Sequence, residues 1–149
     1  MKVSLQSGLL SSTRREQIAH QFAMSDLVLP FWGYRKKMPM HQIVRLEGEG
    51  NYTVFHFADG TQLMVSLTLK KLESRLSPKV FVRPHKKNII NLLYLESINP
   101  DRQQLSVSLL NGDRVDVSRR KATAFMQHLR GFQKELVLLE TQPELAVAA

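Results

Sequence analysis

The sequence predicts a mainly β protein with a helix near each end and a third helix inserted among the strands. From His41 to Val117 most segments alternate apolar and polar residues, the pattern of half-buried strands. These segments are short and are separated by turn residues, which is typical of an antiparallel meander. With 149 residues the chain is long enough to bury a substantial core.

The first forty residues predict a short helix and an extended segment. Thr13–Glu16 has the Thr-x-x-Glu form of a capping box. Ile18 and Phe22 follow four residues apart, so we predict a helix over residues 12–24 with a narrow apolar stripe. After it, residues 27–31 have the composition of an edge strand.

Eight segments are predicted as strands because they are rich in β-branched and aromatic residues. They are 43–46, 52–57, 62–65, 81–82, 89–90, 93–98, 105–110 and 114–117. Gly60 marks a hairpin turn between the second and third segments, and Gly112 marks a tight turn between the last two. The sequence shows no internal repeat.

Two helices are predicted after the first hairpin. Leu69, Leu72 and Leu76 fall on one helical face, so a helix is expected to cover one side of the sheet. A terminal helix is predicted to begin at Ser118 as its N-cap and to stop at Gly131.

We divide the chain into three parts on this basis. Residues 1–37 form an N-terminal extension, 38–131 form the β domain, and 132–149 form a C-terminal helix extension with a frayed tail.

The chain is strongly basic. Lys and Arg number 21 against 13 Asp and Glu, for a formal net charge of +8. Such a charge favours a polyanionic partner, either nucleic acid or an anionic membrane. Charge alone does not choose between them, and a soluble protein that is merely basic stays an alternative.

Several classes of protein are excluded by what the sequence lacks. The absence of cysteine removes disulfides, thiolate nucleophiles and cysteine-based zinc sites, and it fits a reducing compartment. The N-terminus lacks the pattern of a signal peptide, and the apolar run over 27–32 is too short to cross a bilayer. We therefore expect a cytoplasmic protein without membrane insertion.

No catalytic pattern is present. The histidines at 20, 41, 56, 85 and 128 lack metal-ligand spacing, and there is no Walker loop or Gly-x-Ser-x-Gly elbow. We expect no enzymatic activity, no metal and no cofactor. His56 is expected within a sheet, and His128 on the solvent face of the terminal helix.

Three segments carry the residues most suited to binding a polyanion. In Arg83–Lys87, Pro84 should interrupt the strand and place the basic side chains on a projecting loop. The alternative is a solvated charge run that keeps a sheet edge soluble.

The second segment, Arg119–Lys121, lies at a predicted helix start, where the helix dipole disfavours cations unless an anion docks there. The alternative is an exposed charge whose small cost is tolerated. The third, Glu47–Tyr52, is a flexible turn in which Asn51 has the donor and acceptor pair that matches adenine. An ordinary hairpin turn with Tyr52 half-buried is equally consistent.

The order and spacing of these segments resemble the LytTR family of bacterial DNA-binding domains, the output modules of many response regulators. The resemblance runs from about Met38 to Arg130. Its markers are Leu46-Glu47, Asn51-Tyr52, Phe81-Val82-Arg83-Pro84-His85-Lys86, Ile89-Ile90-Asn91, Gly112, Val115 and Val117-Ser118-Arg119-Arg120.

The resemblance implies an elongated fold of short antiparallel strands in small sheets with an inserted helix. It also implies that loops on one edge enter successive major grooves of double-stranded DNA. By position, the DNA-contacting residues fall on Asn51, Tyr52, Arg83, His85, Lys86, Ser118 and Arg120. Charge and proximity add Lys87, Arg119 and Lys121 to this set.

The resemblance further implies direct-repeat promoter sites, with one copy on each repeat. A homodimer on DNA is then expected, aided by the Ile18 and Phe22 stripe. Only about forty residues precede the domain and they show no α/β pattern, so a receiver domain is not expected and control would come from a separate signalling partner. Lys86-Lys87-Asn88 stands where the family often has Arg-Ser-Tyr, so base preference does not carry over.

The rival interpretation is a basic, non-catalytic module that binds RNA or a protein or membrane partner through 27–32 and the C-terminal helix. Neither terminal helix has a large basic amphipathic face for a membrane. RNA binding usually needs exposed aromatic platforms, and only Tyr52, Phe55 and Phe57 cluster in the sequence.

Overall fold

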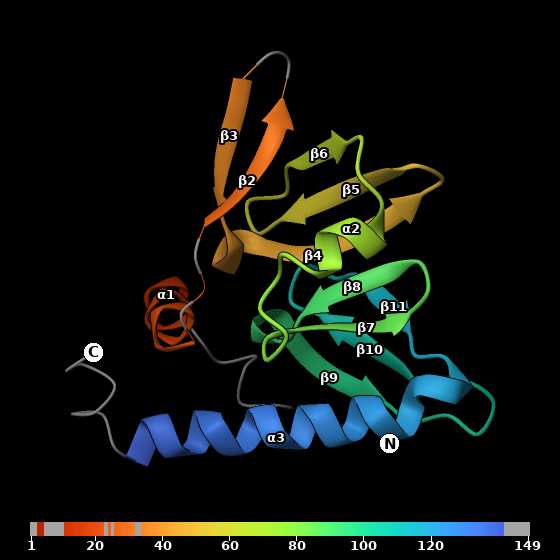
Figure 1. Ribbon diagram of the computed structural model, residues 1–149. Helices are drawn as coiled ribbons and strands as arrows, with labels where there is room; N and C mark the ends of the chain where they lie inside the picture. The colour runs from red at the N-terminus through yellow and green to blue at the C-terminus, as the bar shows by residue number, and fades with distance from the viewer. Residues whose placement is uncertain (1–2, 5–10, 23, 25, 32–33, 142–149) are drawn as a thin grey trace.

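Short antiparallel strands dominate the computed structural model, which describes residues 3–4, 11–22, 24, 26–31 and 34–141 (Figure 1). The strands are β1 (Val3–Ser4), β2 (Asp26–Phe31), β3 (Tyr34–Pro39), β4 (Ile43–Glu49), β5 (Tyr52–Phe57), β6 (Gln62–Val65), β7 (Phe81–His85), β8 (Asn88–Asn91), β9 (Leu95–Asn99), β10 (Ser106–Leu109) and β11 (Arg114–Asp116). The helices are α1 (Ser12–Gln21), α2 (Leu69–Glu73) and α3 (Ala122–Thr141), with 3-10 turns η2 (Met40–Gln42), η3 (Leu92–Tyr94) and η4 (Arg119–Lys121).

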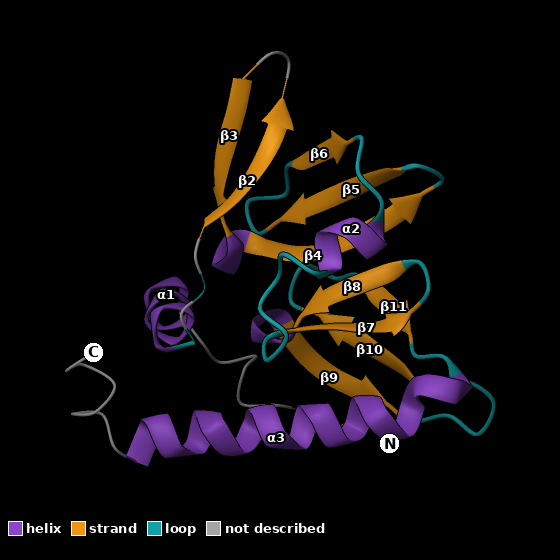
Figure 2. Ribbon diagram, viewed as in Figure 1, coloured by secondary structure: helices purple, strands orange, loops and turns teal. Residues whose placement is uncertain are grey.

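The strands form three antiparallel sheets (Figure 2). One has the order β6-β5-β4-β8-β7, the second β1-β9-β10-β11, and β2 pairs with β3 alone as a hairpin. The long helix α3 runs beneath the two larger sheets in Figure 1, and the β2–β3 hairpin projects at the opposite end. The predicted mainly β fold of small antiparallel sheets with an inserted helix is confirmed.

The hydrophobic core follows the alternation seen in the sequence. In β5, Thr53, Phe55 and Phe57 are buried, and the residues between them lie on the opposite, partly buried face of the strand. The predicted apolar face of α2 is confirmed, since Leu69, Leu72 and Leu76 are all buried. The hairpin turn at Gly60 and the tight turn at Gly112 are also present, and both glycines have positive φ.

The N-terminal helix differs from its prediction in its cap and in its apolar stripe. Ser11, not Thr13, is the N-cap, and its Oγ accepts a hydrogen bond of 3.1 Å from the backbone N–H of Arg14. Ile18 is 1% exposed, and Phe22 stacks on Phe132 of α3 with ring centroids 5.8 Å apart. The stripe therefore packs within the chain rather than presenting a surface to a second copy.

The C-terminal helix also differs. It begins at Ala122 after the 3-10 turn η4, and the side chain of Ser118 makes no capping hydrogen bond. The predicted stop at Gly131 is wrong, because α3 continues to Thr141. Burial of Phe132 and Leu136 outweighs the roughly 1 kcal/mol that a helical glycine costs.

Two strand predictions need correction in detail. The segment 93–98 begins as the 3-10 turn η3, capped by the Asn91 side chain, which accepts a hydrogen bond of 2.9 Å from the N–H of Leu93. The strand over 27–31 exists, but it is half of the β2–β3 hairpin, and β3 contains the basic run Arg35–Lys37.

Candidate nucleic-acid interface

The structure brings the three predicted segments together along one edge of the molecule. The backbone N–H of Gly48 in β4 donates to the carbonyl oxygen of Lys87 at 2.8 Å. The N–H of Ser118 donates to the carbonyl oxygen of Pro84 at 2.9 Å. The β4–β5 turn, the β7–β8 turn and η4 consequently follow one another down the right side of Figure 1.

At the β4–β5 turn, the flexible segment is shorter than the sequence suggested. Glu47–Glu49 belongs to β4, and only Gly50 and Asn51 form the turn. Gly50 has φ +60°, a conformation that glycine adopts without strain. The Asn51 side chain is exposed and Tyr52 is 48% exposed, so both are accessible to a ligand.

At the β7–β8 turn, the expected loop over Arg83–Lys87 is wrong in part. Strand β7 continues through Pro84 to His85, because a register shift after Val82 accommodates a residue without an N–H to donate. Lys86 and Lys87 alone form the turn, which is tightened by a hydrogen bond of 3.2 Å from the Lys87 N–H to Nδ1 of the partly buried His85.

Two of the predicted contact residues point into the protein. Nη2 of Arg83 donates to the carbonyl oxygen of Lys86 at 2.7 Å, and its Nη1 lies 3.3 Å from Oε1 of Glu73. Nζ of Lys121 donates to the carbonyl oxygen of Arg83 at 3.3 Å. Partial burial and the nearby positive charges of Arg83 and Arg120 lower the pKa of Lys121, although Glu73 opposes the shift.

The remaining cations differ in how firmly they are held. Lys86, Lys87 and Arg120 are exposed, and none of their side chains has a hydrogen bond or ion pair with the described residues. Arg119 is also exposed, but its Nε and Nη2 both donate to the carbonyl oxygen of Gln103, at 3.3 and 3.1 Å. Ser118 is partly buried. Of the contact residues predicted from the sequence, three cations on this edge therefore have no partner among the described residues.

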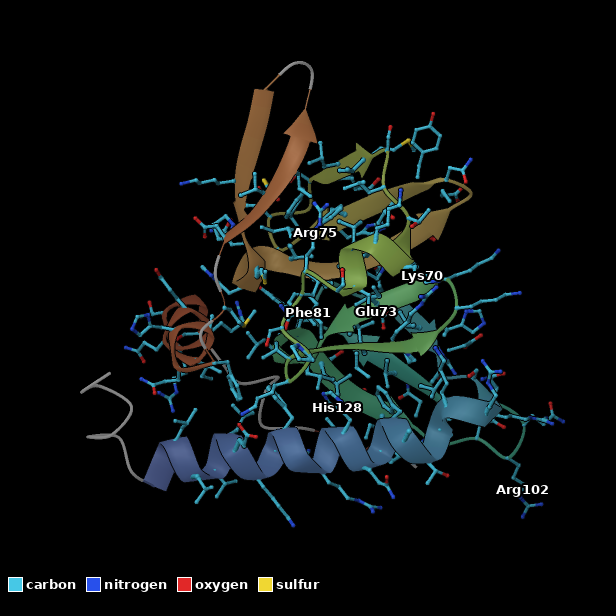
Figure 3. The ribbon with its side chains drawn as sticks, in the orientation of Figure 1. Lys70, Glu73, Arg75, Phe81, Arg102 and His128 are labelled. Atoms are coloured by element: carbon cyan, nitrogen blue, oxygen red, sulfur yellow. The ribbon has the colours of Figure 1, made fainter. Side chains whose placement is uncertain are left out.

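Sequence reasoning missed two residues at this edge. Arg102 is exposed on the β9–β10 loop, next to the Gln103 carbonyl that holds Arg119, and it points away from the molecule in Figure 3. Glu73 lies on α2, whose leucine spacing predicted only a covering helix. No local motif marks either residue, since only the fold brings them beside the predicted segments.

A polar network on Arg45 supports the edge from behind. Nε of Arg45 donates to Oδ2 of Asp113 at 2.7 Å, and its Nη1 donates to Oδ1 of Asn88 at 2.9 Å. Glu47 lies between Arg45, at 3.5 Å, and Nε2 of His56, at 3.0 Å. This network links β4, β5, β8 and the β10–β11 turn. His56 lies within a sheet, as predicted, and Glu47 is its hydrogen-bond partner.

The same network shifts the acidity of one carboxyl group. Burial alone would raise the pKa of Asp113, but hydrogen bonds from Arg45 and Asn111, together with the charges of Arg45 and His56, lower it below its ordinary value. Asp113 is therefore held as a carboxylate that pairs with Arg45.

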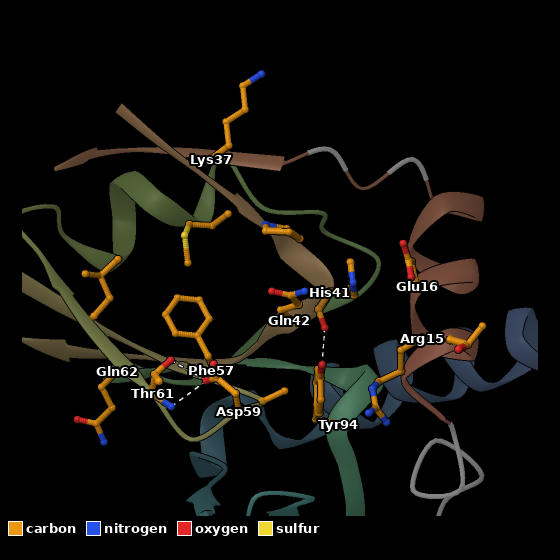
Figure 4. A pocket seen from close by; sticks show the side chains of 15 residues that line it. Arg15, Glu16, Lys37, His41, Gln42, Phe57, Asp59, Thr61, Gln62 and Tyr94 are labelled. Carbon is orange, nitrogen blue, oxygen red and sulfur yellow. Dashed lines mark hydrogen bonds between the residues drawn. The ribbon is translucent and has the colours of Figure 1, made fainter. Parts of the chain in front are cut away.

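Two hollows lie near these elements. One, of about 310 Å³, is lined by Glu73, Arg83 and Lys121, and by His128 of α3. The prediction that His128 faces solvent holds only in part, because the residue is partly buried and its Nε2 lies 2.9 Å from the carbonyl oxygen of Lys79. The other, of about 790 Å³, opens between α1, β3 and the β5–β6 turn and includes Arg15 and Tyr94 (Figure 4).

The described residues form neither a metal-binding cluster nor a membrane-spanning helix. Among the described residues, no group of three or more His, Cys, Asp or Glu side chains could hold a metal ion. Within those same ranges, no helix is long and apolar enough to cross a membrane. The aromatic cluster does not form an exposed platform either, since Phe55 and Phe57 are 0% and 7% exposed.

Comparison with known families identifies the domain. Residues 35–130 match the model of the LytTr DNA-binding domain. The chain belongs to the LytTR family. The LytTR region holds the β4–β5 turn, the β7–β8 turn and η4, so the edge described above lies wholly within the matched residues.

Individual relatives agree with this assignment. The LytTR chain is 35% and 36% identical, over 107 residues each, to the heme-containing CO-sensing transcriptional regulators RcoM 1 and RcoM 2 of Paraburkholderia xenovorans strain LB400. Each alignment covers 66% of this chain and 38% of the relative, so the chain spans well under half the length of these proteins.

A solved structure shares the LytTR fold. It is the LytTr DNA-binding domain of a protein described as a methyl-accepting/DNA response regulator from Bacillus cereus. The two superpose with a TM-score of 0.61 at 25% sequence identity, covering 70% of this chain and 96% of the other.

Proposed function

We propose that this LytTR protein is a non-catalytic transcription regulator that acts in the cytoplasm and binds double-stranded DNA at specific promoter sequences. The observation that carries the proposal is the edge on which two backbone hydrogen bonds join three distant segments, and on which the exposed side chains of Lys86, Lys87 and Arg120 have no partner among the described residues. Membership of a family of DNA-binding domains supports it, as does the description of the RcoM relatives as transcriptional regulators.

The residues of the edge have different proposed roles. Lys87 neutralises a phosphate, which adds affinity on any sequence. Asn51, Lys86 and Arg120 are exposed and approach base edges in the major groove, where Arg and Lys pair with guanine and Asn pairs with adenine. Tyr52, His85, Ser118 and Arg119 line the surface between them.

Arg83 and Lys121 are assigned a supporting role. Their cationic groups are bonded to backbone carbonyl oxygens of β7 and of its turn, so they shape the surface from beneath. This assignment departs from the direct contacts that the family resemblance suggested for Arg83.

Direct-repeat sites would be bound by two copies, one on each repeat. Because Ile18 and Phe22 pack inside the chain, the stripe on α1 is not offered as the contact between copies. We propose instead that DNA itself brings the two copies together.

Selection of bound duplexes from a random DNA pool at about 150 mM salt tests the proposal, because non-specific electrostatic binding is already weakened there. Recovery of a short motif, repeated in the same orientation, is the expected result. The matched control carries alanine at Lys86, Lys87 and Arg120 and should recover no motif. Failure of the wild-type chain to enrich any sequence would overturn the proposal, and tight binding of single-stranded RNA in the same buffer would favour the RNA-binding alternative.

A further inference from the structure

The side chain of Arg83 holds the β7–β8 turn from its inner side, in addition to the His85 ring that accepts from the Lys87 N–H. The guanidinium of Arg83 donates to the carbonyl oxygen of Lys86 at 2.7 Å, a shorter contact than its 3.3 Å contact with Glu73. Hydrogen bonds of a charged donor are about twice as strong as neutral ones, so this contact is well suited to fix the turn. The orientation of this hydrogen bond depends on what holds the other nitrogen atoms of the guanidinium.

Glu73 holds the other end of that guanidinium. Its Oε1 lies 3.3 Å from Nη1 of Arg83, and Figure 3 shows Glu73 on the α2 turn above β7. Helix α2 is itself fixed, because Leu69 and Leu72 are buried at 5% and 0% exposure. The carboxylate therefore stands on an anchored element and orients a side chain that reaches the DNA-facing turn.

The carbonyl groups of residues 83–87 connect this turn to the whole edge. The carbonyl of Arg83 accepts from Lys121, and that of Pro84 accepts from Ser118. The carbonyl of Lys87 accepts from Gly48, next to the Asn51 turn. A change in the tilt of the β7–β8 turn would therefore also displace the β4–β5 turn and η4.

We propose that Glu73 is a positioning residue for DNA recognition, acting through Arg83 to fix the Lys86–Lys87 turn and, with it, the spacing of the three segments. The inference rests on the proposed function. A carboxylate beside a DNA-binding edge repels phosphate, so removing its charge should by itself strengthen DNA binding. A positioning role predicts weaker binding to the preferred site instead.

Glu135 offers a matched control. Like Glu73, it forms an ion pair on the surface, in its case with Lys79 at 3.7 Å, and its side chain is 44% exposed against 49% for Glu73. Glu73→Ala and Glu135→Ala therefore remove the same charge from similarly exposed positions. A purely electrostatic effect would be much the same in sign for both variants.

The first experiment compares affinity for the selected duplex with affinity for an unrelated duplex at equal salt. Glu73→Ala should lower affinity for the selected site about two- to fivefold, the range expected for loss of an exposed ion pair. Its affinity for unrelated DNA should hold or rise, as for Glu135→Ala. Glu73→Gln keeps an oxygen acceptor for Arg83 and should recover part of the preference. Equal behaviour of Glu73→Ala and Glu135→Ala on both duplexes would overturn the proposal.

The second experiment separates this proposal from the proposed function. Amide hydrogen exchange in the DNA-free protein should show faster exchange at Lys87 and Gly48 in Glu73→Ala than in Glu135→Ala or the wild type. Unchanged exchange at both amides would contradict the positioning role whatever DNA the protein prefers. If exchange rises but the wild-type chain shows no sequence preference, the turn is positioned as stated and the regulator function is the part that fails.

Discussion

Gly48 lies where strand β4 passes α2, and a methyl group there would be crowded by Leu69. A Cβ built on Gly48 would lie 3.0 Å from Cδ1 and 3.3 Å from Cγ of Leu69. Leu69 is 5% exposed and its neighbour Leu72 is fully buried, so Leu69 has little space into which it could move. Adding a methylene to a well-packed core costs about 1–3 kcal/mol.

We expect Gly48→Ala to lower the free energy of unfolding by about 1–2 kcal/mol. This is near the lower end of that range, because a shift of a few tenths of an ångström would relieve the contact and because alanine reduces the entropy of the unfolded chain relative to glycine. For a chain of this size the midpoint of thermal unfolding should fall by about 2–8 °C. The measurement is thermal and urea unfolding followed by circular dichroism. Gly131→Ala is the control, since nothing lies within 4 Å of its Cβ and a helical alanine should stabilise by about 0.5–1 kcal/mol.

A double variant tests the stated cause. Leu69→Ala removes the side-chain atoms that crowd the new methyl group. The double variant Gly48→Ala/Leu69→Ala should therefore lose less unfolding free energy than the sum of the losses in the two single variants. Strict additivity, or a Gly48→Ala protein as stable as the wild type, would refute this reasoning. Binding should weaken along with stability in the single variant, because the Gly48 N–H donates to the Lys87 carbonyl at the edge.

Three further outcomes are expected. Arg120→Ala should cost about 1–3 kcal/mol on the preferred duplex and relax the preference at one base pair, as measured by competition with single-base variants of the site. Lys87→Ala should weaken binding to every duplex alike and reduce the slope of log K against log salt by about one unit, so an effect confined to one sequence would contradict its assignment to phosphate. The pKa of Asp113 is lowered in the folded state, so its stabilising pairing with Arg45 is present above the ordinary carboxyl pKa and is lost as the pH falls through the lower folded-state value. Urea unfolding from pH 5 downward should therefore show a shallower loss of stability in Asp113→Asn, and identical pH profiles would contradict the linkage.

Periodicity predicted those parts of the fold in which neighbouring residues share one environment. The alternation in β5 and the leucine spacing of α2 each place buried residues on one side, so both elements could be located before the structure was known. The order of Asn51-Tyr52, Phe81–Lys86 and Val117–Arg120 likewise indicated the family and the edge. These patterns are local, so they can be recognised without knowing which distant residues come into contact.

The wrong predictions concern residues whose structure is decided by contacts with distant parts of the chain. Arg83 appeared to be a free cation because its partner Glu73 lies on another element. Gly131 appeared to stop a helix because the burial of Phe132 against Phe22 is invisible until α1 and α3 meet. The register shift in β7 lets Pro84 stay in a strand, and no residue type marks that shift.

The two hydrogen bonds that join the edge also constrain when it can form during folding. Gly48 to Lys87 and Pro84 to Ser118 each close a long stretch of chain, and closing such loops carries an entropy cost that local turns avoid. The β5–β6 hairpin can pair early, whereas the edge is complete only when both long-range closures are made. A chain that is still on the ribosome, with Ser118 not yet released, already contains the β4–β5 and β7–β8 turns. It still lacks the hydrogen bond from Ser118 to Pro84 that places η4 beside them.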